Sequence, residues 1–178
     1  MKNAMFIALA ASGAAMAATV DVTSDIESSV TWTADNEYNL TTQIYVRPGA
    51  TLTIEAGTRV VSTATANGSG ALCVVNGGQI FINGDSNAPV VMTSSEDNGN
   101  WRASCNEWGN LTICGDAYIG FDGVTNSGGF PGNTLAPSAS NEANMEGLVE
   151  EAGNPSLNNY GGGDDDYDAG NISYLSLR

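Results

Sequence analysis

The feature that most constrains the fold is a short element that occurs twice, 28 residues apart. Residues 46–55 read VRPGATLTIE, and residues 74–83 read VVNGGQIFIN. In each copy a valine and a glycine turn precede a strand pattern with apolar residues two apart. Such a repeat is typical of a β-solenoid, in which each coil buries its inward side chains only by stacking on its neighbours. The repeat therefore predicts apolar ladders that place Leu52 over Ile80 and Ile54 over Ile82.

The rest of the chain after residue 18 also indicates β-structure. Short runs rich in Val, Ile, Thr and Tyr are separated by Gly, Asn and Asp, and no long stretch has helical periodicity. Residues 108–113 (WGNLTI) read as a weaker third copy of the element, and residues 172–177 as another strand. We predict an all-β chain that winds as a right-handed parallel β-helix. A β-sandwich, which also has many short strands separated by turns, is the alternative.

The first 17 residues predict a secretory signal peptide. Lys2 is followed by a mostly apolar run that ends in Ala-Met-Ala at 15–17, small residues of the kind that a signal peptidase recognises. The run is too short to span a bilayer, so we expect no transmembrane segment there. A buried N-terminal helix is the alternative. We expect the mature domain, residues 18–178, to be secreted or held at the outer cell surface.

The charge of the chain excludes one class of partner. The net charge is −15, and removing the signal segment with its Lys2 makes it −16. Such a surface repels phosphate backbones and anionic lipid, so we expect no nucleic-acid partner. Much of this charge is also explained by the need to keep a β-rich protein soluble and its strand edges unpaired.

The cysteines and the absence of histidine limit the chemistry. An oxidising compartment permits a disulfide, for which Cys105 and Cys114 are the plausible local pair. Cys73 lies in an apolar strand pattern and reads as a small buried residue. Because the chain contains no histidine, it lacks the commonest general base and any Ser-His-Asp or Cys-His system. We assign no catalytic residue.

Residues 120–170 have a different composition. Asn, Gly, Ser and Pro dominate residues 120–144, and hydrophobic residues are sparse up to residue 170. We read this region as a loop-rich excursion from one coil, a common place for binding residues. The chain ends in a strand pattern with no capping segment, which predicts an N-terminal portion of a longer protein.

An acidic loop inside this excursion is the candidate metal site. Residues 161–170 are glycine-rich and contain four aspartates, Asp164, Asp165, Asp166 and Asp168. Carboxylate oxygens crowded on a flexible loop suit Ca²⁺, although the spacing is not that of an EF-hand. A solvated acidic turn is the alternative. Residues 96–98 form a second acidic turn, which is a weaker candidate for a metal site.

Five motifs, in order, resemble those of bacterial cell-surface β-helix proteins. Residues 46–58 resemble their V-x-x-G-A-x-L-x-I-x-x-G-T element, and residues 89–94 (PVVMTS) their P-I-x-F-T-S. Residues 108–113 resemble W-G-G-L-x-I, with Asn110 at the second glycine, and residues 145–148 and 160–164 resemble I-E-G-L and Y-G-G-x-D. The resemblance implies a right-handed parallel β-helix of a large secreted or surface protein. It supplies no catalytic residue.

Two functions fit these features. The first is a non-enzymatic structural or adhesive β-helix segment, stabilised by Ca²⁺, with polysaccharides or other surface proteins as partners. The second is a carbohydrate-active enzyme, either a glycoside hydrolase with two flanking carboxylates or a polysaccharide lyase with Ca²⁺ and a basic residue. Five aromatic residues near the excursion could stack on sugar rings or lie buried in the core (Trp101, Trp108, Tyr118, Phe121, Phe130).

Overall fold

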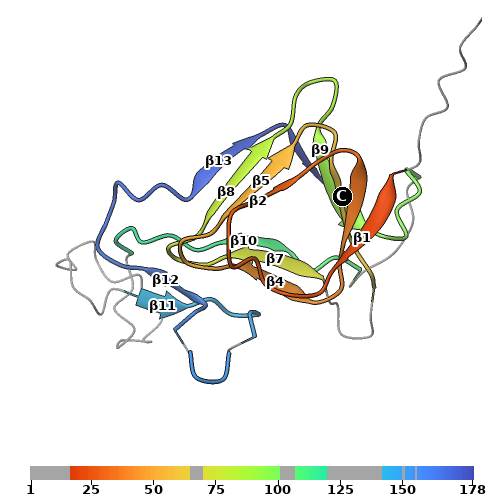
Figure 1. Ribbon diagram of the computed structural model, residues 1–178. Coiled ribbons are helices and arrows are strands. Elements are labelled where there is room, and N and C mark those ends of the chain that lie inside the picture. The colour runs from red at the N-terminus through yellow and green to blue at the C-terminus, as the bar shows by residue number, and fades with distance from the viewer. Residues whose placement is uncertain (1–16, 65–69, 101–106, 120–141, 150, 155) are drawn as a thin grey trace, which may run out of the picture.

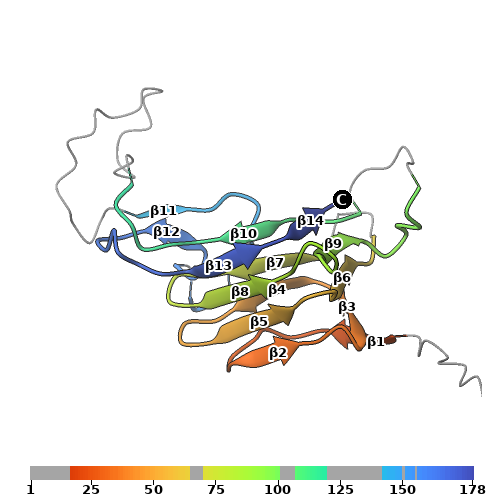
Figure 2. The same ribbon diagram turned by 90° about the horizontal axis from the view of Figure 1, so that it is seen from above.

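The chain winds as a three-sided parallel β-helix in the computed structural model (Figure 1). The structure describes residues 17–64, 70–100, 107–119, 142–149, 151–154 and 156–178. The predicted signal peptide lies outside these residues except for Ala17. The described part contains strands and no helix. The coils stack along one axis in the side view (Figure 2).

Each side of the prism is one parallel sheet. The first sheet contains β1 (Ala18–Val22), β3 (Asn36–Leu40), β6 (Arg59–Ser62), β9 (Val90–Ser94) and β14 (Leu175–Leu177). The second contains β4 (Gln43–Val46), β7 (Ala71–Val74) and β10 (Leu111–Ile113). The third contains β2 (Val30–Trp32), β5 (Thr51–Glu55), β8 (Gln79–Asn83) and β13 (Gly170–Ser173). From β2 onward the strands of the coils visit the three sheets in cyclic order, which a β-sandwich of facing antiparallel sheets does not do.

The predicted ladders form in the predicted register. Leu52 pairs with Ile80 and Ile54 with Ile82 in the parallel β5–β8 pair. These side chains are at most 1 % exposed, since alternate residues of each strand point into the coil and stack on the coils above and below. The main core continues this pattern on all three sides of the prism.

The third copy of the element was assigned wrongly. β10 stacks on β7 in the second sheet, with Leu111 opposite Leu72. The strand that continues the Ile54–Ile82 ladder is β13, in which Ile172 pairs with Ile82. The spacing of Leu111 and Ile113 fits any side of the prism, because every inward-facing strand has the same two-residue alternation.

One antiparallel hairpin lies outside the coils. β11 (Glu142–Asn144) pairs with β12 (Asn159–Gly161), between β10 and β13 in the sequence. Residues 120–141 of the predicted excursion lie outside the described part of the chain. The hairpin lies beside the second sheet (Figure 1), and the apolar side chains between them form a second cluster.

Candidate functional site

The acidic loop joins β12 to β13, and its four aspartates are solvent-exposed. One oxygen of Asp164 accepts a hydrogen bond from the amide of Asp166 at 3.0 Å. Asp165 accepts from the amide of Tyr118 at 3.0 Å, and Asp168 from the amide of Gly170 at 2.8 Å. These bonds turn three carboxylates toward backbone amides and order the turn.

No described group of three or more carboxylates or thiols is arranged to hold a metal ion. The calcium site at Asp164, Asp165, Asp166 and Asp168 therefore stays a prediction. The exposed carboxylates keep oxygens directed to solvent, and Ca²⁺ accepts oxygen ligands in loose geometry. Binding at this loop would require the carboxylates to turn toward a common centre.

Tyr167 is one of the residues that fix the loop to the coils. The hydroxyl of Tyr167 accepts from the amide of Gly77 at 2.8 Å and donates to the carbonyl of Gly78 at 2.9 Å. Burial is the main cause that raises the pKa of Tyr167 above its ordinary value. The loop also donates the amide of Asp164 to the carbonyl of Asp116 at 2.9 Å. The aspartates thus sit on a loop whose base has a defined position.

In the second acidic turn, residues 96–98, Asp97 is held by hydrogen bonds and lies close to two arginines. The carboxylate of Asp97 accepts from the amide of Gly99 at 2.8 Å and from the hydroxyl of Thr93 at 2.9 Å. The guanidinium groups of Arg59 and Arg178 lie 4.0 and 3.9 Å away. The hydrogen bonds from Gly99 and Thr93 are the main causes that lower the pKa of Asp97.

A polar clamp binds the segment after β11 to the outward face of β4. Gln43 donates to the carbonyl of Gly147 at 2.8 Å and accepts from the amide of Val149 at 2.8 Å. The hydroxyl of Tyr45 donates to the carbonyl of Val149 at 2.8 Å. Arg47 makes a two-pronged bond to Glu151, at 2.6 and 2.9 Å. Two side chains of β4 and that of Arg47, which directly follows it, therefore align the whole segment.

Arg47 is the electrostatic centre of this clamp. Its guanidinium also pairs with Asp25, whose carboxylate accepts from Nε at 2.7 Å. The hydrogen bond to Glu151 is the largest cause that raises the pKa of Arg47, and the same bond lowers the pKa of Glu151. Arg47 is thus a fixed cation held between the N-terminal coil and the hairpin.

An apolar layer fills the space between the second sheet and the hairpin. Its buried members are Tyr45, Cys73, Val75, Cys114, Leu148 and Leu157, and Met145 and Tyr160 pack against them. Cys73 is buried as predicted, with no exposed surface, but on the outward face of β7. Cys114 lies beside Cys73, while Cys105 of the predicted local pair lies outside the described residues.

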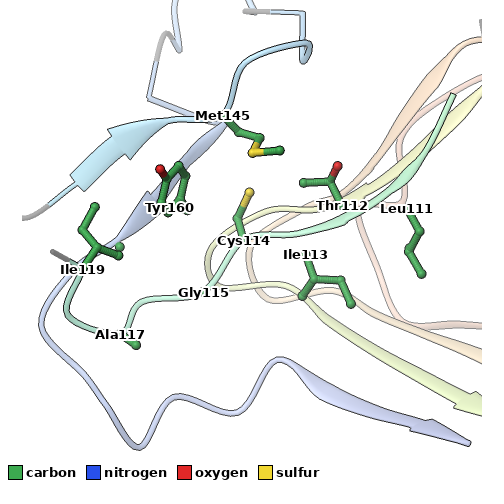
Figure 3. A pocket seen from close by; sticks show the side chains of 10 residues that line it. Leu111, Thr112, Ile113, Cys114, Gly115, Ala117, Ile119, Met145 and Tyr160 are labelled. Carbon is green, nitrogen blue, oxygen red and sulfur yellow. The ribbon is translucent and has the colours of Figure 1, made fainter. Parts of the chain in front are cut away.

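A shallow hollow of about 400 Å³ opens beside this layer (Figure 3). Leu111 and Ile113 lie on one side of β10 in this view, and the Cys114 sulfur points to the other side, toward Met145. The lining residues are Leu111, Thr112, Ile113, Cys114, Gly115, Ala117, Ile119, Met145, Tyr160 and Gly161. None of them carries a carboxylate or a basic group, so the hollow provides neither a carboxylate pair nor a cation.

A second hollow, of about 430 Å³, lies at the N-terminal end of the stack and includes Asp21, Asp25 and Glu27 in its lining. Asp25 is already paired with Arg47. Trp32 and Tyr38 also line this hollow, where they stack with ring centroids 4.6 Å apart. Both rings are more than nine-tenths buried, so they offer little face to a sugar.

Two of the aromatic residues near the excursion are described. Trp108 packs against the main core, and Tyr118 is 37 % exposed. Trp101, Phe121 and Phe130 lie outside the described residues. Within the described region, only Tyr118 of this set could present a ring for stacking on a sugar.

The described region contains no helix with the length and hydropathy needed to cross a membrane. The family model of the pectate-lyase like beta helix domain matches residues 24–178. Searches of curated proteins and of solved structures gave no significant match.

Proposed function

Because the chain belongs to the pectate-lyase-like β-helix family, we propose that it is a non-enzymatic structural or adhesive β-helix of the cell exterior. Its partners are polysaccharides or other surface proteins, and Ca²⁺ bound at the loop with Asp164, Asp165, Asp166 and Asp168 stabilises it. The proposal builds on the family and on what the charged side chains do in the fold.

The observation that carries the proposal is the engagement of the arginines in structural ion pairs. Arg47 binds Asp25 and Glu151, and Arg59 binds Glu37 at 2.8 Å. A lyase needs a basic side chain that can accept a proton from its substrate. A doubly paired guanidinium with a raised pKa, such as that of Arg47, is poorly suited to this role. In these contacts the charges hold segments of the coil together.

Incubation with a panel of neutral and acidic polysaccharides tests this function. We expect the mature chain to be retained on one or more immobilised polysaccharides and to release no reducing ends or unsaturated sugars. Turnover of any polysaccharide at an enzymatic rate would contradict the proposal. The assay is run with millimolar calcium and again with EDTA, so that a calcium-dependent lyase is not missed.

The calcium component has a separate test. We expect the thermal midpoint of the mature chain to be higher in millimolar calcium than in EDTA, because a ligand that binds only the folded state stabilises it. The double variant Asp164→Asn/Asp166→Asn should lose this difference. Asp35→Asn/Glu55→Gln, which removes the same charge from exposed sites elsewhere, should keep it. Equal midpoints in calcium and EDTA would remove Ca²⁺ from the proposal.

The second candidate function is a carbohydrate-active enzyme on the same scaffold. It is favoured by the pectate-lyase-like character of the family. An acidic polysaccharide would approach a chain of net charge −15 only against repulsion, unless a cation bridged the two. This enzyme would therefore act on a polyanion only with calcium, and on a neutral glycan with or without it.

The location outside the cell is tested by N-terminal sequencing of the chain from culture medium and cell-surface fractions. We expect the mature chain to begin at Ala18. A chain that retains Met1 and stays inside the cell would contradict export.

A further inference from the structure

Two cysteines meet beneath the β11–β12 hairpin, and the proposed function uses neither. β7 and β10 are neighbours in the second sheet, where Cys73 pairs with Thr112. Cys114 is the first residue after β10, and its amide donates to the carbonyl of Val74 at 2.8 Å. Thr112 and Cys114 are two residues apart and so share the outward face of the sheet with Cys73.

The two thiols are in contact and hidden from solvent. Cys73 and Cys114 are 0 % and 1 % exposed and belong to the same apolar layer. The hydrogen bond between the two sulfurs and burial both raise the pKa of Cys73, whereas the same bond lowers the pKa of Cys114 against the opposing effect of burial. Cys114 is therefore the sulfur that more readily becomes the reactive thiolate.

We propose that Cys73 and Cys114 form a disulfide that joins β10 to β7 across neighbouring coils. The proposal rests on the export assumed in the proposed function, because disulfides persist in oxidising compartments. It replaces the local pairing of Cys105 with Cys114 that the sequence suggested.

The bond forms by exchange with a small disulfide such as oxidised glutathione while the chain folds, before the hairpin covers the two thiols. The Cys114 thiolate attacks one sulfur of the oxidant and releases the first glutathione thiolate. Cys73 then loses its proton and attacks the Cys114 sulfur, which releases the second. Two cysteine thiols are oxidised, one glutathione disulfide is reduced to two thiols, and the two protons pass through water to the released thiolates.

The bond requires the two sulfurs to come closer than a non-bonded contact. A disulfide needs a sulfur–sulfur distance of about 2.05 Å. Cys114 lies just past the last ladder position of β10, and Gly115 follows it. A Cβ placed at Gly115 would meet its nearest atom, in Tyr167, only at 3.7 Å. The space beside Gly115 is therefore open on its side-chain side.

Peptide mapping of the exported full mature chain tests the proposal. The chain is alkylated at low pH without reductant, digested and analysed by mass spectrometry. We expect one cross-linked peptide pair containing Cys73 and Cys114, with Cys105 alkylated. Alkylated Cys73, or a link between Cys105 and Cys114, would overturn the proposal. This measurement needs no variant and so does not depend on a variant folding.

Two variants and a reductant extend the test. Cys105→Ser should keep the cross-link, whereas Cys114→Ser should leave Cys73 open to alkylation after unfolding. Reduction should lower the Tm of the wild type by about 10 °C, from the loop-closure effect on a chain of this size. The Tm of Cys114→Ser should not respond to reduction. An unchanged wild-type Tm would contradict a stabilising bond.

Failure of export and failure of the disulfide can be told apart. Chain purified in the reduced state, unfolded and then refolded with oxidised glutathione should acquire the same Cys73–Cys114 link, wherever the cell keeps the protein. Exported chain with free Cys73 would overturn the disulfide alone. Chain that stays in the cell, but forms the link with glutathione, would overturn the location alone.

Discussion

The interior of the coils and the layer beneath the hairpin are both buried, but different interactions stabilise them. In the interior, one apolar pattern repeats from coil to coil, as in the Leu52–Ile80 and Ile54–Ile82 pairs. In the outer layer, Tyr45 and two cysteines pack with aliphatic side chains, and hydrogen bonds and ion pairs from β4 hold the hairpin segment. The interior thus depends on repetition, and the outer layer on specific pairs.

This difference predicts two levels of stability in one chain. Truncating a side chain in the middle coils removes contacts with both neighbouring coils, so the change destabilises the stack on both sides. The hairpin contacts the coils on one face only. We therefore expect the hairpin to open locally at a lower free energy than the coils unfold. The five predictions below compare the two regions.

The largest effect should come from truncating one leucine in each region. Leu52 has no exposed surface in the interior, and Leu157 is 6 % exposed in the outer layer. We expect Leu52→Ala to reduce the free energy of unfolding by about 4 kcal/mol and Leu157→Ala by about 2 kcal/mol, because only the hairpin can collapse onto the cavity. Denaturant unfolding measures both values. Equal losses would mean that the two regions form one cooperative unit.

Two glycines with positive φ provide the next comparison. Gly170 at the start of β13 has φ +117°, and an added Cβ would lie 1.8 Å from the carbonyl oxygen of Ile80. Gly153 in the hairpin connection has φ +95° and open space around it. We expect Gly170→Ala to cost about 3 kcal/mol, from backbone strain and a clash, and Gly153→Ala about 1 kcal/mol, from strain alone. If Gly153→Ala were the more costly, the hairpin would be as tightly packed as the coils.

The sequence predicted the interior well because its information is local and periodic. The 28-residue offset and the two-residue alternation were enough to place Leu52 over Ile80 in the observed register. The same two-residue alternation led to the wrong assignment of residues 108–113 as a third copy of the element. Their alternation says which side chains face inward but not which side of the prism they occupy, and the connection before β10 changes the repeat length.

The outer layer was not predicted, because its partners are far apart in sequence and follow no period. Gln43, Tyr45 and Arg47 each bond to a residue 104 positions later. One signal was available: these polar residues alternate with buried Ile44 and Val46. Such outward polar groups on an otherwise apolar strand indicate that a further segment covers the sheet, but they do not identify it. The burial of Cys73 was predicted, while its contact with Cys114 depended on the register of β10.

The third prediction concerns the hydroxyl of Tyr45. Tyr45→Phe leaves the ring and removes the bond to the carbonyl of Val149, so we expect a loss of about 1 kcal/mol. Amide hydrogen exchange should quicken in residues 147–149 and stay unchanged in β5 and β8. Tyr38→Phe, which removes the hydroxyl that accepts from the amide of Thr33 in the first coil, is the matched control. Faster exchange in β5 would show that the clamp and the coils are coupled.

The same tyrosine predicts a loss of stability in alkali. Burial is the main cause that raises the pKa of Tyr45 from 10.0 to about 12. The folded state therefore keeps a proton that the unfolded state gives up, and stability is complete below pH 10 and falls as pH rises toward 12. The loss of stability between pH 10 and 12 that comes from Tyr45 should be absent in Tyr45→Phe. If both proteins lose the same amount of stability between pH 10 and 12, Tyr45 is not its source.

The smallest effect should appear at acid pH, in the ion pair between Arg47 and Glu151. Hydrogen bonding to Arg47 lowers the pKa of Glu151 below its ordinary value of 4.5. The unfolded state then binds a proton more readily than the folded state, so the contribution is complete above about pH 4.5 and is lost as pH falls through the lowered pKa. Glu151→Gln should melt at a lower temperature than the wild type at pH 7, and the two should converge once the pH is below the lowered pKa of Glu151. Glu55→Gln, on an exposed site of β5, should follow the wild type throughout.

Added salt should also reduce the difference between Glu151→Gln and the wild type at pH 7, since Glu151 is a surface group whose attraction to Arg47 is screened. A gap that persists in acid strong enough to protonate Glu151 would mean that Glu151 acts through packing rather than charge, and the clamp would then resemble the interior more closely than its polar contacts suggest.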